Sequence, residues 1–253
     1  MFRRGFWKKK HYLNKMSLRE LVFAYFQYYS IQAYIAVGLA GIWVAVTYAT
    51  ALLPNLLAVA AAVLIYPLVW YLLHRYVLHG RIFYKSPLTA RVWKRIHYDH
   101  HRDPHDLEIL FGALYTTLPT IVAATAPIGW FFDGLAGAAS AISAGMFITC
   151  FYEFCHCFEH LTIKPKSRWL MNMKTRHMAH HFHDEDGNFG ITNFIWDRAF
   201  GTLYARQDRP VKSTTVYNLG YTEAEAEKYP WVARYSGGVN EDHTPRDRRQ
   251  QAS

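Results

Sequence analysis

The chain has 253 residues and a mass of 29.4 kDa, and 51% of its residues are apolar. This composition excludes a disordered or collagen-like protein, because it supplies enough apolar side chains for a sizeable core. The formal charge of +9 suits nucleic acid, anionic lipid or an acidic substrate, so charge alone does not choose a partner. The three cysteines, Cys150, Cys155 and Cys157, are crowded into one apolar run, and we expect them to be packing residues rather than a disulfide framework.

Residues 1–30 are basic and aromatic but lack the apolar core of a signal peptide. Within them, residues 17–30 read SLRELVFAYFQYYS, an amphipathic and aromatic pattern suited to the headgroup layer of a membrane. We therefore expect residues 1–30 to form a basic interfacial segment.

Two long stretches of the chain are almost free of charge. Residues 31–73 contain no charged residue or histidine, and residues 109–155 contain only Asp133 and Glu153. Each stretch is about twice the ~20 apolar residues that one membrane-spanning helix needs. With turns at Pro54-Asn55 and within residues 129–134, the pattern predicts four transmembrane helices in two hairpins, at about 31–53, 56–73, 109–132 and 134–155. The alternative, a soluble all-α protein with two buried helical hairpins, would require unusually long charge-free helices in its core.

The basic residues indicate how such a protein is oriented. All 28 lie before Ile31, between His74 and Glu108, or after Cys155, and neither expected hairpin turn has one. An even number of spans places these three segments on one side, which the positive-inside rule makes cytoplasmic. We therefore expect a multi-pass membrane protein with both termini and the active site on the cytoplasmic side. Anionic membrane lipid then accounts for the excess charge, and no nucleic-acid partner is expected.

Twelve of the 14 histidines fall in or beside four clusters that abut the ends of the apolar runs. The clusters read HRYVLH at 74–79, HYDHH at 97–101, HCFEH at 156–160 and HMAHHFH at 177–183. Residues three and four apart share a face of a helix, so each of the last three boxes can direct its imidazoles one way. His74 and His79 are five apart, roughly 140° around a helix. They would need a local distortion to reach one ion, and one metal for each ring would remove that difficulty.

Ten boxed imidazoles exceed what one metal can accept, and imidazole suits zinc, copper, iron and nickel, so the spacing favours a two-metal centre. His11 and His243 lie in the tails and are expected to play no part. His105 and His183 trail their boxes and are expected at most to support the ligands, as are Glu159 and Asp184.

Two other functions fit part of the pattern. His156, Glu159 and His160 match the H-x-x-E-H motif of inverted zinc proteases, a metallohydrolase reading that would leave eight clustered histidines without a purpose. A metal transporter or metal store is a further alternative, but its sites would be expected inside the spans.

The order of the boxes, H-x4-H, H-x2-HH, a membrane hairpin, H-x3-H and H-x2-HH, resembles the fatty acid hydroxylase and sterol desaturase superfamily of membrane di-iron enzymes. The resemblance covers roughly residues 60–205. It is closest to the sphingolipid fatty acid 2-hydroxylases, through the strings WYLLHRYVLHG, EFCHCFEH and KTRHMAHHFHDEDGNFGITNFIWDRAFGT. By matching position it implies ten metal ligands: His74, His79, His97, His100, His101, His156, His160, His177, His180 and His181.

The resemblance implies an all-α integral membrane fold with about four transmembrane helices and a cytoplasmic helical cap that carries the di-metal site. Residues 31–205 would be the hydroxylase domain and residues 206–253 a polar C-terminal tail. The implied cofactors are two iron ions, which zinc could replace on isolation, with no bound haem or nucleotide.

The implied reaction is O2-dependent hydroxylation of a lipid acyl chain near its carboxyl end. We expect a separate b-type cytochrome or ferredoxin to deliver the electrons, since the sequence shows no fused cytochrome domain. Carotenoid or sterol hydroxylases and desaturases share the box pattern and remain alternatives. After the second box the sequence reads RDPHDLEILFG, which differs from the residues usual in the family at this point. We expect this difference to bear on the choice of substrate.

Overall fold

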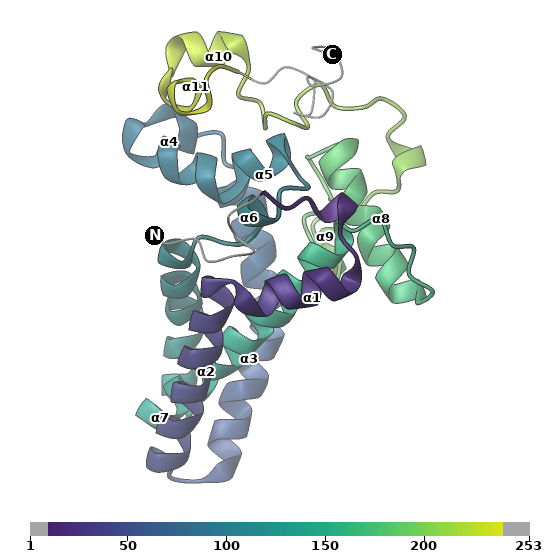
Figure 1. Ribbon diagram of the computed structural model, residues 1–253. Helices are drawn as coiled ribbons and strands as arrows, with labels where there is room; N and C mark the ends of the chain where they lie inside the picture. Colours follow the sequence, from purple (N-terminus) through teal and green to yellow (C-terminus); the bar gives the residue numbers. More distant parts are fainter. Residues whose placement is uncertain (1–9, 240–253) are drawn as a thin grey trace. The chain divides into compact units, whose positions relative to one another are not determined.

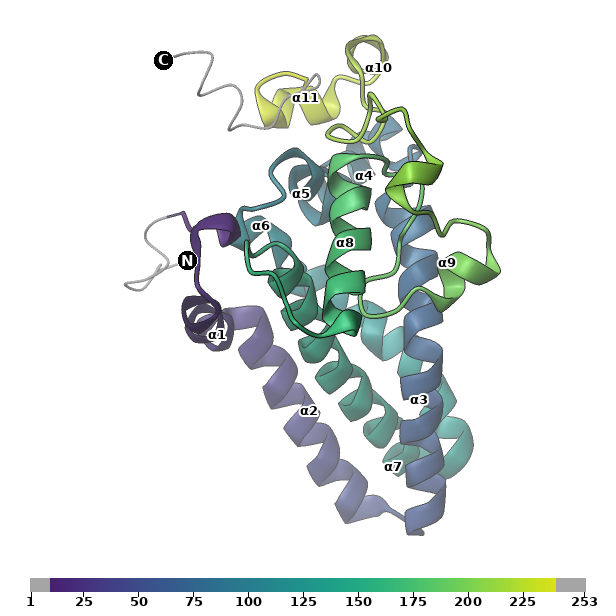
Figure 2. The same ribbon diagram turned by 90° about the vertical axis from the view of Figure 1, so that its right-hand side faces the viewer.

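The computed structural model describes residues 10–239, which form helices joined by loops (Figures 1 and 2). Within this range there is no β-strand, only an isolated bridge between Tyr12 and Asp106. The expectations for residues 1–9 and for 240–253, including His243, lie outside the described residues. The chain divides into two compact units: Met1–Ser17, Tyr71–Leu110 and His156–Ser253 form unit 1, and Leu18–Trp70 and Phe111–Cys155 form unit 2.

Unit 2 is built from long apolar helices. It contains α1 (Leu18–Gln27), α2 (Tyr29–Tyr48) and the larger parts of α3 (Leu52–Leu72) and α7 (Leu114–Glu159). Within residues 10–239, three helical segments are long and apolar enough to cross a membrane: Tyr29–Tyr48, Leu52–Lys85 and Leu107–Glu159. Large apolar side chains on them are exposed, among them Trp43 (67%), Leu64 (76%) and Phe131 (84%). Side chains of this kind suit contact with lipid, so the helical class and the presence of helices able to span a membrane agree with the sequence.

The first turn of unit 2 does not lie where the sequence suggested. Residues 49–51 connect α2 to α3, whereas Pro54 and Asn55 lie in the first turns of α3. Proline is tolerated there because the first N–H groups of a helix have no partner within the helix. In the sequence, a proline near the start of a helix cannot be told from a proline in a turn, and the turn was therefore predicted a few residues too late.

The second turn lies at Asp133 and Gly134, inside the range expected for it. These two residues leave helical geometry within α7, and Gly134 adopts a positive φ of 50°. A Cβ atom at Gly129 would meet the carbonyl oxygen of Gly137 at 2.1 Å, so the two backbones are in contact on either side of the break. The chain thus reverses direction there.

A polar network joins the two turns of unit 2. The Asp133 carboxylate accepts hydrogen bonds from the Thr50 amide at 3.1 Å, the Thr50 hydroxyl at 2.5 Å and the Asn55 side-chain amide at 2.5 Å. The Ser140 hydroxyl donates to Asn55 Oδ1 at 2.7 Å. Both turns therefore lie at the same end of unit 2.

Unit 1 consists of shorter helices. They are η2 (Leu13–Lys15), η3 (Leu73–Leu78), η4 (Phe83–Lys85), α4 (Pro87–Trp93), η5 (Lys94–Tyr98), α5 (Asp99–Arg102), α6 (Leu107–Leu110), α8 (Arg168–Phe182), α9 (Ile195–Ala199), η6 (Arg206–Asp208), α10 (Glu223–Lys228) and α11 (Trp231–Ser236). Among them, η3 and η5 are π-helices.

The residues that follow 205 were expected as a polar tail, but through 239 they belong to the core of unit 1. Leu219, Tyr221 and Val232 pack with Trp93 and Tyr98 in one buried cluster, and Figure 1 shows α11 lying against α4. Burial of these side chains holds the segment in place, even though the surrounding sequence is rich in polar residues.

Candidate metal centre

Unit 1 brings together all ten boxed histidines in two groups of five. Group A consists of His74, His79, His97, His101 and His180, and group B of His100, His156, His160, His177 and His181. Within each group, one ring nitrogen from every residue lies within 4.8 Å of the others. All ten side chains are buried except that of His79, which is half-buried.

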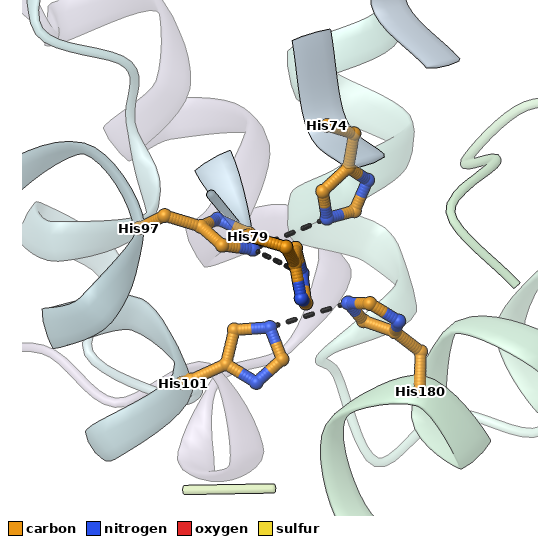
Figure 3. Close-up of side chains that lie close together, drawn as sticks. All are labelled: His74, His79, His97, His101 and His180. Atoms are coloured by element: carbon orange, nitrogen blue, oxygen red, sulfur yellow. Dashed lines mark hydrogen bonds between the residues drawn. The ribbon is translucent and has the colours of Figure 1, made fainter. Parts of the chain in front are cut away.

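The rings of group A point toward one another (Figure 3). His97 Nε2 lies 3.2 Å from His74 Nε2 and 2.9 Å from His79 Nε2, and His101 Nε2 lies 3.2 Å from His180 Nε2. Ligand nitrogens about 2.1 Å from one ion would be roughly 3 Å apart in octahedral geometry. The spacing of the rings is therefore that of ligands sharing an ion.

The first box is distorted in just the way that lets two histidines five residues apart meet. Leu73–Leu78 is a π-helix, in which the His79 amide donates to the His74 carbonyl at 3.1 Å. Hydrogen bonding from i to i+5 places residues five apart one above the other, whereas an α-helix would separate them. Both residues consequently belong to group A, and the expectation of one metal for each ring was wrong.

The second and fourth boxes each serve both groups, although the sequence suggested that each would face one way. His97 and His101, four residues apart, lie in group A, while His100 lies in group B. On α8 the assignment is reversed, since His177 and His181 lie in group B and His180 in group A. The cause is that residues i+3 and i+4 lie on opposite sides of residue i, about 100° apart from each other around the helix. A helix running between two ion positions can therefore supply both.

Backbone carbonyls fix the orientation of three imidazoles of group A. The Nδ1 atom of His74 donates to Phe189 O at 2.6 Å, that of His101 to Val216 O at 2.8 Å, and that of His180 to Gly187 O at 2.8 Å. A carbonyl oxygen only accepts, so Nδ1 carries the proton and Nε2 keeps its lone pair. This is the arrangement by which proteins orient metal-binding imidazoles.

Buried acids hold the loops that supply these carbonyls. Asp197 accepts from the amides of Phe189 at 2.7 Å and Gly190 at 2.8 Å and from the Thr202 hydroxyl at 2.8 Å. The buried Glu185 carboxylate accepts from the hydroxyl of Thr215, the residue before the Val216 anchor. The loops are thus secured independently of any ion.

Group B lacks such carbonyl anchors on four of its residues. The Nδ1 atoms of His100, His160, His177 and His181 are buried without a hydrogen-bond partner among the described residues. Glu159 is also fully buried, and its carboxylate Oε2 lies 3.7 Å from Nδ1 of His177. Neither carboxylate oxygen of Glu159 has a hydrogen-bond partner in the described part of the chain.

Burial favours the uncharged form of these imidazoles. Desolvation lowers the pKa of His101 to about 3, and it lowers the pKa values of His97, His100, His177, His180 and His181 well below 6.5, with repulsion from neighbouring imidazoles adding to the effect. Neutral imidazoles present lone pairs at neutral pH. Ten convergent, neutral nitrogen donors in two groups fit two transition-metal ions.

The other candidates lie around this centre rather than in it. His105 stacks on Phe182 with 5.6 Å between ring centroids and meets His160 edge-on at 5.8 Å. His183 Nε2 donates to Arg209 O, and the Asp184 carboxylate pairs with the Arg209 guanidinium. Neither group A nor group B contains His11.

Sequence reasoning missed the groups that hold the ligands. The anchors Phe189, Val216 and Gly187 act through backbone oxygens, which no residue type reveals. In the sequence, Asp197 was visible only as the end of an aromatic segment and is followed directly by Arg198, which gives no sign that its carboxylate is buried.

The sequence and the fold of this chain resemble those of known proteins. The chain is 33% identical to dihydroceramide fatty acyl 2-hydroxylase FAH2 of Arabidopsis thaliana, over 58% of this chain and 60% of that protein. It is 29% identical to fatty acid 2-hydroxylase of Rattus norvegicus, over 58% of this chain and 39% of the relative. It is 30% identical to ceramide very long chain fatty acid hydroxylase SCS7 of Saccharomyces cerevisiae, over 59% of this chain and 38% of the relative. The matches thus span between about two fifths and three fifths of these relatives.

A solved structure described as full-length scs7p, with only its hydroxylase domain visible, superposes with a TM-score of 0.59 and 25% identity. The match covers 73% of this chain and 68% of that one. The family model for fatty acid hydroxylase matches residues 59–202, more than half of the chain and the range that holds all ten histidines. The chain therefore belongs to the fatty acid hydroxylase family.

Proposed function

We propose that this protein is a membrane di-iron oxygenase that hydroxylates a C–H bond of a lipid acyl chain near its carboxyl end. The observation that carries the proposal is the pair of five-histidine groups, with converging Nε2 atoms, in a member of a family whose relatives are named fatty acid and ceramide hydroxylases. Substrate, metal identity and electron donor are parts of this proposal.

Groups A and B would each hold one ion. Two iron ions bound there would supply activation of dioxygen, one atom of which enters the C–H bond while the other leaves as water, with consumption of two electrons and two protons. Zinc fits the same nitrogen donors but has no redox chemistry. Iron is therefore the proposed active metal, and zinc a competitor for the same groups.

The protein itself would have three tasks in this reaction. The neutral imidazoles offer lone pairs without first losing protons, since burial depresses their pKa values. The carbonyls of Phe189, Val216 and Gly187 fix the orientation of three rings. The burial of nearly all ligands excludes bulk water, which protects a strongly oxidising site from side reactions.

A hydrolytic role for His156, Glu159 and His160 is less consistent with the geometry. His156 and His160 share group B with three further imidazoles, so the site does not have the three protein ligands and open water position of a zinc protease. Glu159 lies beside the outer nitrogen of His177.

We further propose that α2, α3 and the two halves of α7 form four membrane spans. The hydrogen bonds of Asp133 support four spans because they join the two turns at one end of unit 2. Neither turn carries a basic residue. By the positive-inside rule the turns face away from the cytoplasm, and the histidine-bearing residues face it. A cysteine at the exposed Ala51, in a background without the three native cysteines, tests this: labelling from the cytoplasmic side would refute the orientation.

We propose an acyl-chain substrate because two of the histidine boxes directly follow apolar helices in the sequence. The π-helix with His74 follows α3 directly, and α7 ends in the box with His156. A lipid whose tail lies in the bilayer would present the carbons nearest its head group to such a site.

Lipid mass spectrometry on cells with and without the protein tests the reaction. The proposal expects acyl chains that gain one oxygen atom, and fragmentation should place it near the carboxyl end. Loss of two hydrogens would instead indicate a desaturase, and an oxygenated carotenoid or sterol would indicate the other branches of the superfamily.

A further inference from the structure

The outer face of α8 lines a groove that none of the roles above uses. Its volume is about 730 Å³, and it is lined by side chains of α8, by residues 204–207 and by Lys164. Met171, Met178, Ala179 and Phe182 make its surface largely apolar. In Figure 2 the helix α8 faces the viewer. We refer to this feature as the α8 groove.

Positive charge surrounds the α8 groove. Lys164, Lys174, Arg176 and Arg206 line it, and no aspartate or glutamate does. Lys164 and Arg206 are exposed, and none of the ion pairs among the described residues involves either of them. Lys174 is different, because its amine donates to the carbonyls of Glu159 and Leu161 and so caps the end of α7. The groove therefore presents free cations beside an apolar floor, a pattern typical of transient docking sites for acidic proteins.

The α8 groove lies on the other side of the helix that serves both metal groups. His177 and His181 of group B and His180 of group A are in α8, and Met178 and Ala179 of the groove lie between them in the sequence. A helix with its side chains is about 10–12 Å across. A redox group held against the groove would therefore be separated from the ligands by little more than one helix, a path suited to electron tunnelling.

We propose that the α8 groove is the docking site of an acidic one-electron carrier protein, which reduces the metal centre through α8. This rests on the proposed function, which requires two electrons per turnover, delivered one at a time by two successive carrier encounters. An anionic lipid headgroup would also be attracted by Lys164 and Arg206. It would not account for the position of the groove behind the ligand-bearing helix.

Charge reversal tests the proposal without touching the ligands. In the full-length iron-loaded protein, Lys164→Glu with Arg206→Glu is compared with Lys85→Glu with Arg91→Glu, two exposed cations outside the groove that give the same change in net charge. A neutral pair, Lys164→Gln with Arg206→Gln, guards against effects of the new acids themselves. Each protein is reduced in two ways. The first uses a carrier protein, either a soluble acidic b-type cytochrome domain or a [2Fe–2S] ferredoxin, whichever reduces the wild-type protein faster. The second uses dithionite with a viologen mediator.

We expect the groove reversal to slow reduction by the carrier at least about tenfold at low salt, and the neutral pair to slow it less. Raising the salt concentration should slow the wild-type reaction and have much less effect on the reversed variant. Product formation with the mediator should stay within about twofold of wild type, and the control pair should change neither reaction.

If the groove reversal variant is reduced by the carrier as fast as wild type, the docking site is refuted. It is also refuted if the variant loses the same fraction of activity with the mediator as with the carrier. Weaker binding to phosphatidylserine vesicles with unchanged reduction by the carrier would assign the groove to lipid instead. If the wild-type protein forms no product even with the mediator, the proposed oxygenase function itself fails, and this result is distinct from failure of the docking site alone.

Discussion

The Glu159 carboxylate lies 3.7 Å from Nδ1 of His177, with both side chains fully buried. It lies beside a ring nitrogen without a hydrogen bond, whereas backbone carbonyls accept hydrogen bonds from His74, His101 and His180 in group A. One group is thus held by neutral acceptors and the other has a carboxyl group beside a ligand. The surroundings of group A and group B are consequently not equivalent.

Replacing Glu159 by Gln should weaken metal binding in group B more than in group A. The outer nitrogen of His177 would lose a carboxylate neighbour, and loss of such a partner commonly lowers metal affinity or activity by about 10–100-fold. Competition with a chelator, monitored by metal analysis, measures the effect. Asp186→Asn, at an exposed acid, is the control. Equal retention of both ions in Glu159→Gln and wild type would show that the carboxyl group does not support the ligand.

The division of the boxes predicts which ligand substitutions act together. His97→Ala with His101→Ala should lower the bound metal from about two ions per chain to about one, because both residues belong to group A. Adding His180→Ala should cause no further loss, whereas adding His177→Ala with His181→Ala should remove the second ion. Metal analysis of purified protein measures this, and loss of both ions on adding His180→Ala alone would contradict the division.

Activity should be more sensitive than metal content. His100→Ala, His160→Ala and His180→Ala should each leave less than about a tenth of the wild-type hydroxylation, while the protein still inserts in the membrane, because insertion depends on the apolar helices. His11→Ala should leave the activity unchanged. Residual activity above that level in all three variants would count against these residues as ligands.

Asp197 should matter for folding as well as for the metal. Asp197→Ala leaves the amides of Phe189 and Gly190 and the hydroxyl of Thr202 without their acceptor, which should cost about 3 kcal/mol of unfolding free energy. It should also release the Phe189 carbonyl that fixes His74 and so weaken group A. Thermal unfolding and metal analysis measure the two effects. Asp208→Asn, at an exposed acid, should produce neither, and a wild-type result for Asp197→Ala would refute the anchoring role.

The histidines could be found from sequence because ligand-bearing helices repeat their residues at short spacings. The division between groups could not, since each of the helices with His97 or His177 runs between two ion positions and the sequence does not show where these lie. The π-helix at His74 was also missed, because α-helical periodicity was assumed. Leu219, Tyr221 and Val232 lie in a polar-looking stretch, and only the tertiary structure shows that they pack in one buried cluster with Trp93 and Tyr98.

Acid should destabilise the metal-free protein. The pKa of His101 in the folded state is about 3, and those of His97, His100 and His180 are also lowered by burial, whereas histidine in an unfolded chain has a pKa near 6.5. Between these values the unfolded chain binds more protons, so the stability is fully present above about pH 6.5 and falls as the pH is lowered. Thermal unfolding in detergent should give a lower Tm at pH 5 than at pH 7. An equal or higher Tm at pH 5 would show that the imidazoles are not buried as neutral groups.

The most direct test of the central claim is the fate of isotopic oxygen in the reconstituted protein. Metal-free protein in lipid is loaded with ferrous iron or with zinc and supplied with a ceramide or fatty acyl lipid, reductant, mediator and ¹⁸O₂, and the lipid is analysed by mass spectrometry. We predict that only the iron-loaded protein, with about two ions per chain, inserts one ¹⁸O atom into the acyl chain. Turnover by the zinc-loaded protein with none by the iron-loaded one, or product oxygen derived from water, would contradict the oxygenase.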